Sequence, residues 1–168
     1  MLKRAIQAYL SSRRVAVGET VECGWLVFRV TEIGPPVKLE SLDFMRMASF
    51  TTDLSRAEVI YREQQEMLRR HGVEEELCTV RHSAIVSRSY RPGHPDAFLK
   101  RDDAIAGHSS GWYVGVVNDP LSMEEAGTFE LRSLYELSIS DERMIPFWLM
   151  PLGTTAFLAD GTVELTGT

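Results

Sequence analysis

The sequence is poor in cysteine, which excludes two classes of small protein. Cys23 and Cys78 are the only cysteines among 168 residues. Two isolated thiols at this separation form neither a disulfide framework nor the close pairs of a zinc knuckle. We expect both to be reduced and to pack as small apolar residues.

Long hydrophobic runs are also missing. The segment that begins Met1-Leu2-Lys3-Arg4 has no extended apolar stretch behind it, and Arg13 and Arg14 follow soon after Leu10. This segment fits neither a signal peptide nor a membrane span. We therefore expect a cytoplasmic protein that does not enter a membrane.

An excess of positive charge is absent as well. The chain has 24 acidic and 18 basic side chains, which give a formal charge of -6. An acidic surface repels phosphate backbones, so nucleic-acid binding is not expected. The same charge favours a basic protein partner, and it is equally explained as a means of keeping a small domain soluble.

Recognised catalytic and cofactor motifs are not found. No glycine-rich turn between a strand and a helix ends in Lys-Ser or Lys-Thr, so a phosphate cradle is not expected. Ser109 and Ser110 precede a strand, whereas a nucleophile elbow places its serine between a strand and a helix. We expect no cofactor and no catalytic residue.

The four histidines do not have the spacing of metal ligands. One alternative remains open, in which His82, His94 and His108 converge with Asp102 or Asp103 in a metal-dependent hydrolase. The more ordinary interpretation is that these histidines are surface or turn residues.

Hydrophobic residues make up 44% of the chain and charged residues 25%, the composition of a globular protein. We predict one domain over residues 1–168. The main helix is predicted over about 53–71, where apolar residues recur at helical spacing. Thr52 or Asp53 caps its start, and Gly72 ends it.

Strands are predicted where β-branched and aromatic residues gather. These segments are residues 21–33, 39–50, 77–90, 97–100, 111–118, 154–158 and 162–165, while 129–139 is ambiguous between strand and helix. The last two segments flank Ala159-Asp160-Gly161, a turn signal that predicts a hairpin. Together the segments predict an α+β fold in which the main helix packs on a mostly antiparallel sheet. A subdivision near residue 75 is an alternative, with an N-terminal strand pair and helix beside a C-terminal sheet region. Trp25, Trp112 and Trp148 are expected in the core rather than as anchors for a partner.

An ordered set of short motifs runs through the C-terminal half of the chain. The set comprises Ala84–Ser87, Phe98–Arg101, Ser110-Gly111-Trp112, Leu134–Glu136, Met144-Ile145-Pro146 and Pro151–Phe157. In order and spacing this set resembles the immunity protein 33 family over roughly 75 residues. Two positions depart from the family pattern: Ser109 stands where an aspartate is usual, and Val116–Asp119 replaces an acidic run.

The resemblance implies a bacterial immunity protein that binds and neutralises a cognate polymorphic toxin made by the same cell. Toxins of this kind are delivered to competitors by contact-dependent or secretion systems, such as the type VI system. The immunity partner acts by occlusion and needs no active site. The resemblance also implies a structural role for Ser110, Gly111, Trp112, Ile145, Pro146 and Gly153.

The toxin-binding face is expected on exposed loops that are rich in acidic residues. The expected contact residues are Arg101, Asp102, Asp103, Asp119, Glu124, Glu125, Asp141 and Glu142. Two other functions remain as alternatives, namely a regulatory or scaffold domain with a non-toxin partner and the histidine-based hydrolase. The sequence does not indicate an oligomeric state.

Overall fold

The chain folds into two sheets and a few helices, here described from a computed structural model. The structure describes residues 2–11, 13–102, 109–119 and 127–166. The helices are α1 (Leu2–Ser11), α2 (Ser55–His71), α3 (Leu134–Ser140) and the 3-10 helix η1 (Glu142–Phe147). The predicted α+β fold is confirmed.

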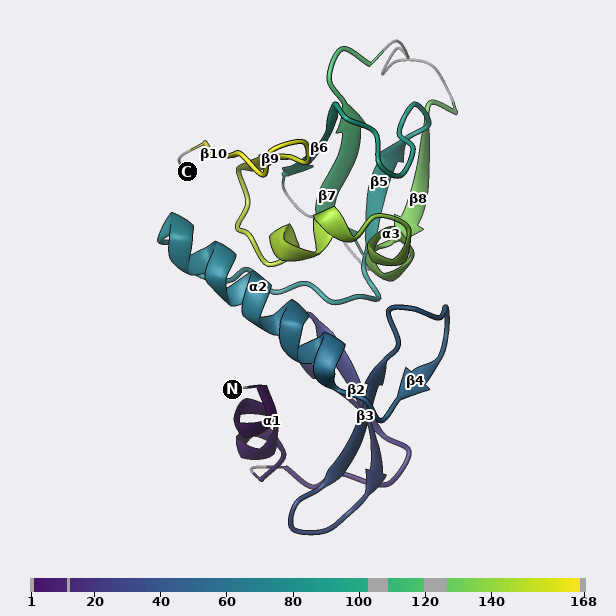
Figure 1. Cartoon of the computed structure of the whole chain (residues 1–168), viewed down its shortest axis with the longest axis vertical. Helices are drawn as coiled ribbons and strands as arrows, with labels where there is room; N and C mark the ends of the chain where they lie inside the picture. The colour runs from purple at the N-terminus through teal and green to yellow at the C-terminus, as the bar shows by residue number, and fades with distance from the viewer. Residues whose placement is uncertain (1, 12, 103–108, 120–126, 167–168) are drawn as a thin grey trace.

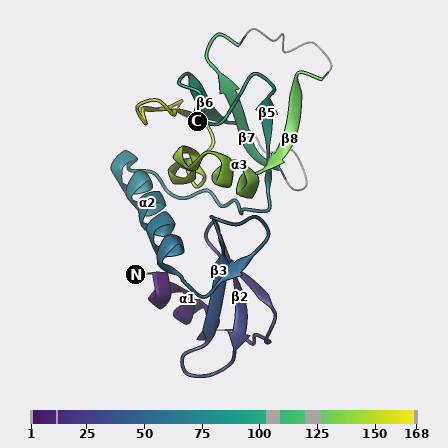
Figure 2. The ribbon, with the colours of Figure 1, turned by 45° about the vertical axis from the view of Figure 1, so that its right-hand side comes forward.

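The smaller sheet is antiparallel and has the order β1-β2-β3-β4. Its strands are β1 (Thr20–Cys23), β2 (Leu26–Glu32), β3 (Lys38–Leu42) and β4 (Phe50–Thr51). It lies at the opposite end of the molecule from the larger sheet, and α2 runs alongside the region between them (Figures 1 and 2).

The larger sheet has the order β10-β9-β6-β7-β5-β8. Its strands are β5 (Ser83–Ser87), β6 (Ala97–Arg101), β7 (Ser109–Val116), β8 (Phe129–Ser133), β9 (Thr154–Phe157) and β10 (Val163–Leu165). The β5–β7 pair is parallel and the other four pairs are antiparallel. The hairpin predicted over 154–165 is therefore confirmed.

Three predicted strands are shorter than the sequence suggested. Residues 21–33 form a hairpin, because Gly24 adopts the left-handed φ of 58° that a tight turn requires. Within 39–50, β3 ends at Leu42 because the Asp43 carboxylate accepts the Met45 N–H at 2.8 Å and so closes a turn. Residues 77–82 are irregular, and only 83–87 form a strand.

The main helix agrees closely with its prediction. It begins at Ser55 and ends before Gly72, which has a φ of 65°. The predicted cap at Thr52 or Asp53 is wrong, because the N-cap residue is Leu54, which makes no side-chain cap bond. Asp53 instead accepts the backbone N–H and the hydroxyl of Ser55. The helix packs on η1, where buried Gln64 donates to the Ile145 carbonyl at 3.0 Å. It also borders the smaller sheet, because Glu58 and Leu39 of β3 line the same hollow.

The ambiguous segment 129–139 contains both a strand and a helix. The change occurs at Ser133, which forms a capping box with Glu136: each side chain bonds the other residue's backbone N–H. A capping box favours a helix start strongly enough to end the strand there. As a result α3 and η1 fold back against one face of the larger sheet (Figure 1).

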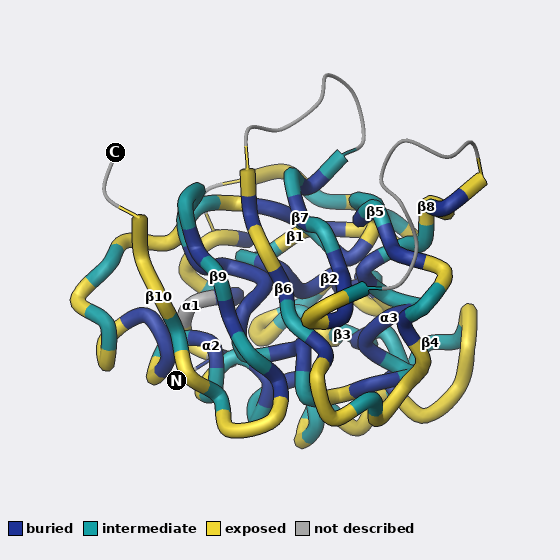
Figure 3. The backbone as a smooth tube through the Cα atoms, turned by 90° about the horizontal axis from the view of Figure 1, so that it is seen from above, coloured by how far each residue is buried: buried dark blue, intermediate teal, exposed yellow. Residues whose placement is uncertain are grey.

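One hydrophobic core draws residues from both sheets and from the helices. Trp25, Trp112 and Trp148 are all fully buried, as predicted. The buried segments gather toward the middle of the molecule, and the exposed ones lie mainly at its periphery (Figure 3). Among the described residues, no helix is both long and apolar enough to cross a membrane.

Candidate interaction surface

The motif Ser110-Gly111-Trp112 joins several elements in the interior. The Ser110 hydroxyl donates to the Ser83 carbonyl at 2.8 Å, and the Trp112 indole N–H donates to the Trp148 carbonyl at 3.2 Å. The two indole rings meet edge to face with centroids 5.6 Å apart. Gly111 supplies a φ of 77° at the irregularity between β5 and β7. These contacts give the motif a structural role.

Arg101 belongs to the same interior cluster, which corrects its prediction as a partner-facing residue. Its side chain is 2% exposed and donates to the carbonyls of Ser110, Glu76 and Met150 at 3.1, 3.0 and 2.5 Å. Its guanidinium also lies 5.5 Å from the Trp112 ring centroid. The physical reason is strand alternation, because Arg101 points to the same side of β6 as buried Ala97 and Leu99.

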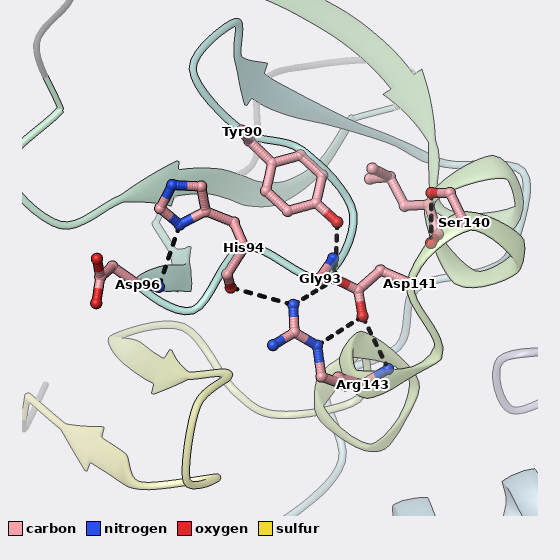
Figure 4. Close-up of polar contacts among 8 residues, drawn as sticks. Tyr90, Gly93, His94, Asp96, Ser140, Asp141 and Arg143 are labelled. Carbon is pink, nitrogen blue, oxygen red and sulfur yellow. Dashed lines mark hydrogen bonds and ion pairs between the residues drawn. The ribbon is translucent and has the colours of Figure 1, made fainter.

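Asp141 is also interior, which corrects its prediction as an exposed contact residue. It is 6% exposed and lies between α3 and η1. Its carboxylate accepts the Tyr90 hydroxyl at 2.9 Å, the Gly93 N–H at 3.0 Å and two Arg143 nitrogens at 2.8 and 2.7 Å (Figure 4). The carboxylate thus ties the loop after β5 to the helices.

The charge state of Asp141 follows from these bonds. Burial alone raises the pKa of the Asp141 carboxyl, but hydrogen bonds from Arg143, Gly93 and Tyr90 outweigh it and hold the pKa below its ordinary value. Burial and the neighbouring carboxylate raise the pKa of the Tyr90 hydroxyl. Asp141 is therefore a charged acceptor with its oxygens engaged, and a general base needs a free one.

The histidines that the hydrolase alternative requires are partly described. The His94 Nδ1 accepts the Asp96 N–H at 3.1 Å, and the His94 carbonyl accepts an Arg143 nitrogen at 3.3 Å (Figure 4). His108 and Asp103 lie outside the described residues. Within the ranges that the structure describes, no group of three or more histidine, cysteine, aspartate or glutamate side chains is placed to hold a metal ion.

The cysteines behave as small buried groups. Burial raises the pKa of the Cys78 thiol to about 12, and this thiol donates to the Trp148 carbonyl at 2.9 Å. Burial and the charge of Glu75 raise the pKa of Cys23. Both thiols are free and protonated at neutral pH, and a neutral thiol is a poor nucleophile.

Of the remaining predicted contact residues, the three that the structure describes do not form one surface. Asp102 follows β6 at one end of the larger sheet, whereas Asp119 follows antiparallel β7 at the other end. Glu142 opens η1 and pairs with Arg56 of α2 at 2.7 Å. Asp103, Glu124 and Glu125 lie outside the described residues.

The family-motif residues Ile145, Pro146 and Gly153 have structural positions. Ile145 is buried and Pro146 lies within η1. Gly153 has a φ of 81°, and a Cβ there would stand 2.6 Å from the Thr166 carbonyl oxygen. Glycine is needed at position 153 because the C-terminal segment passes so closely.

The outer face of the larger sheet carries a row of aromatic rings that the sequence interpretation did not identify as a surface. Phe157 of β9, Phe98 of β6, Tyr113 of β7 and Phe129 of β8 follow one another across the sheet. Successive ring centroids are 6.4, 5.8 and 5.9 Å apart. We call these four rings, together with Ile85 and Leu131, the aromatic face.

The aromatic face is only partly shielded from solvent. Its four rings and Ile85 are half-buried, and Leu131 is 71% exposed. Gly115 allows the rings to lie close to the strand, because a Cβ there would stand 2.6 Å from Tyr113 Cε1 and 2.9 Å from Phe98 Cε1. The rings form a continuous row in which each contacts the next, rather than scattered apolar side chains.

Polar groups border this face. The Asp119 carboxylate accepts hydroxyls from Ser87 and, at 2.6 Å, Ser89. Lys100 is exposed and pairs with Asp102 at 3.0 Å. Burial and the charge of Asp119 raise the pKa of the Tyr113 hydroxyl, so this group is a neutral hydrogen-bond donor at pH 7. An apolar centre with a polar rim is the usual anatomy of a protein-binding surface.

A separate hollow of about 780 Å³ lies between α1, β2, β3 and the start of α2. Its lining is mainly apolar, with Leu39 and Leu54 among the contributors. Lys38, on its border, already pairs with Glu32 at 2.6 Å, and Asp53 is engaged by Ser55. This hollow therefore offers mainly apolar contact.

The chain was compared with known proteins in three ways. No family model, no curated protein and no solved structure matches it. The resemblance to the immunity protein 33 family therefore rests on the sequence motifs alone.

Proposed function

We propose that this chain is an immunity protein that binds a cognate toxin in the cytoplasm and neutralises it by occlusion, with the aromatic face as its contact surface. The aromatic face is the observation that carries the proposal. Binding energy in protein interfaces is concentrated in a few aromatic and arginine side chains near the centre of the contact. This face presents four such rings on a rigid sheet.

Preorganisation makes the aromatic face well suited to tight binding. Each ring contacts its neighbours, and the absence of a side chain at Gly115 allows Tyr113 and Phe98 to pack against the backbone of β7. Side chains already held in place lose little rotamer entropy when a partner covers them. The formal charge of -6 favours association with a basic partner over a longer range.

The engagement of the interior polar groups supports binding over catalysis. Arg101, Asp141 and Cys78 are buried, and each already bonds backbone or side-chain partners. Such groups hold the scaffold of the sheet in shape. A protein that acts by occlusion requires only this rigidity and a complementary surface.

Co-expression with the toxin encoded beside this gene tests the proposal. Cells that produce the toxin should survive when the wild-type protein is present, and the two proteins should co-purify. Death at the rate seen without the protein, together with no complex, would contradict the proposal. A complex with a neighbouring protein that is not toxic would favour the regulatory alternative instead.

A matched pair of variants tests whether protection depends on the aromatic face or on other exposed apolar residues. Phe98→Ser removes a ring from the aromatic face and should weaken protection. Ile33→Ser removes an exposed apolar side chain after β2 of the other sheet and should leave protection unchanged. If both variants protect the cells equally well, the aromatic face is not the toxin-binding surface.

A further inference from the structure

Strand β8 forms one edge of the larger sheet. Within the described part of the chain, its strand neighbour is β5, and the pairing runs without irregularity from Ser83–Ser133 to Ser87–Phe129. The strand sequence Phe-Glu-Leu-Arg-Ser contains no proline, lysine or bulge. Proline, lysine and bulges commonly prevent further pairing at natural edge strands, and so do other charged side chains. Strand β8 carries one charge of each sign, at Glu130 and Arg132.

The backbone of Leu131 points away from β5. Arg88 N–H donates to the Thr128 carbonyl at 2.9 Å, and Leu134 N–H donates to the His82 carbonyl at 2.8 Å. Hydrogen-bonded pairs alternate in an antiparallel ladder, so the even-numbered residues of β8 bond to β5. The N–H and carbonyl of Leu131 consequently face the open edge.

The side chains beside Leu131 are self-complementary. Glu130 and Arg132 flank it and lie on the same face of the strand, 4.0 Å apart at their closest charged atoms. If two copies of β8 pair antiparallel about Leu131, Glu130 of each copy stands opposite Arg132 of the other. Opposite charges directly across a ladder stabilise the pairing, especially at positions that are not themselves hydrogen-bonded.

We propose that two copies of this chain associate through β8, with a two-fold axis at Leu131. Leu131 exchanges both of its backbone hydrogen bonds with its counterpart, and the 71% exposed leucine side chains come together on the aromatic face. The two larger sheets then become one continuous sheet. A closed two-fold contact of this kind is self-limiting, because it uses the β8 edge of both copies.

The opposite edge of the sheet lacks this complementarity. Strand β10 has three residues, Val163-Glu164-Leu165. A two-fold pairing at its centre would place Glu164 against Glu164 of the other copy, which is repulsive. The charges therefore select β8 over β10.

The contact through β8 involves few residues, so we expect a weak dimer that forms only as the protein concentration rises. Ser133 N–H is already bonded by the Glu136 carboxylate at 3.0 Å and is not free to extend the ladder. Strong pairing is therefore concentrated at Leu131 and the two charge pairs beside it. This arrangement makes association sensitive to single charge changes.

Sedimentation velocity of the purified chain over a range of concentrations tests the proposal without any toxin. The wild type should pass reversibly from monomer to dimer. Glu130→Arg and Arg132→Glu each place like charges opposite one another and should weaken the dimer roughly tenfold or more. Glu164→Arg, on the other edge, is the matched control and should dimerise as the wild type does.

Mixing the two single variants is the most decisive test of the charge pairing between the two copies. A Glu130→Arg chain is positive at both positions and an Arg132→Glu chain is negative at both, so a one-to-one mixture should form a heterodimer. The double variant with both changes should dimerise like the wild type. Circular dichroism checks that every variant is folded.

Three results would overturn the proposal. These are a wild type that stays monomeric at all concentrations, a dimer that neither charge reversal weakens, or single variants that fail to recover on mixing although both are folded. Leu131→Asp offers a second route that leaves the charge pairs in place, and it should also yield a monomer. Because no partner protein is used, failure here leaves the toxin-binding proposal standing.

Discussion

The two faces of the larger sheet are built from the same strands but differ in how far their side chains are buried. On the inner face, Leu99 and Arg101 of β6 are buried, and the Arg101 guanidinium donates to three carbonyls of the same chain. On the outer face, Phe98 and Lys100 of the same strand remain half-buried or exposed. The inner face stabilises the fold, whereas the outer face keeps apolar area available for contact with another molecule.

This contrast shows that aromatic content alone does not identify a binding surface. Trp112 and Tyr113 are adjacent in β7, yet Trp112 is fully buried and Tyr113 belongs to the aromatic face. The period of two in a strand assigns them to opposite sides. Substitutions that alternate along one strand should therefore alternate between large effects on stability and small ones.

The largest effect is expected from Arg101→Ala on the inner face. Removing the guanidinium leaves three interior carbonyls without their donor and opens a space beside Trp112. We expect the free energy of unfolding to fall by about 3–5 kcal/mol. Chemical denaturation measures it, and a loss below about 1 kcal/mol would contradict the buried network.

A smaller loss is expected from Asp141→Asn, which removes the charge that joins the loop after β5 to the helices. The cost should be about 2–4 kcal/mol near neutral pH, because Arg143 loses its anionic partner. Thermal unfolding at pH 7 measures this change.

The same variant should alter the pH dependence of stability. Because the pKa of Asp141 is depressed in the folded state, its contribution is present above its unfolded pKa of about 3.9 and is lost as the pH falls through the folded pKa. The stability difference between the wild type and Asp141→Asn should therefore shrink below about pH 4. A difference that is constant from pH 7 to pH 2 would show that the charge is not what stabilises this junction.

An intermediate loss is expected from Gly115→Ala, which brings a methyl group against the rings of the aromatic face. The new Cβ would approach Tyr113 Cε1 to 2.6 Å, so the rings must shift. Overpacking of this kind costs about 1–3 kcal/mol, and near-ultraviolet circular dichroism should report the changed ring environment. Gly34→Ala is the control, because its nearest neighbour would be at 3.9 Å; a spectrum unchanged in both variants would contradict the close support of the rings.

The smallest effect is expected from Lys100→Ala on the outer face, directly beside Arg101. Its ion pair with Asp102 is exposed, and pairs of this kind contribute about 0–1 kcal/mol. Denaturation at low and high salt should show little change in either condition. A loss comparable to that of Arg101→Ala would remove the distinction between the faces.

Local signals in the sequence predicted much of the fold. The helix over 55–71 was marked by its spacing and by Gly72, and the C-terminal hairpin by the turn at Ala159-Asp160-Gly161. The hairpin at Gly24 was missed because apolar residues continue through the turn. The packing of α2 on η1 was missed because it depends on contacts between residues about 80 positions apart.

The site was harder to predict because charge does not indicate exposure. Arg101 and Asp141 were expected at the surface as charged residues near loops, yet both are buried with partners distant in sequence. The alternation of side chains along β6 did indicate that Arg101 is buried, because it lies on the same side of the strand as Ala97 and Leu99. The aromatic face arises from five strands whose order, β9-β6-β7-β5-β8, no local pattern specifies.

The most direct test of the central claim compares Phe98→Ser with Leu99→Ala, neighbours on opposite faces of β6. Affinity for the toxin encoded beside this gene is measured by titration calorimetry at a temperature where both variants are folded. Phe98→Ser should bind about tenfold or more weakly, whereas Leu99→Ala should lose about 2–5 kcal/mol of stability and keep its affinity. Wild-type affinity in Phe98→Ser would contradict the assignment of the aromatic face as the binding surface.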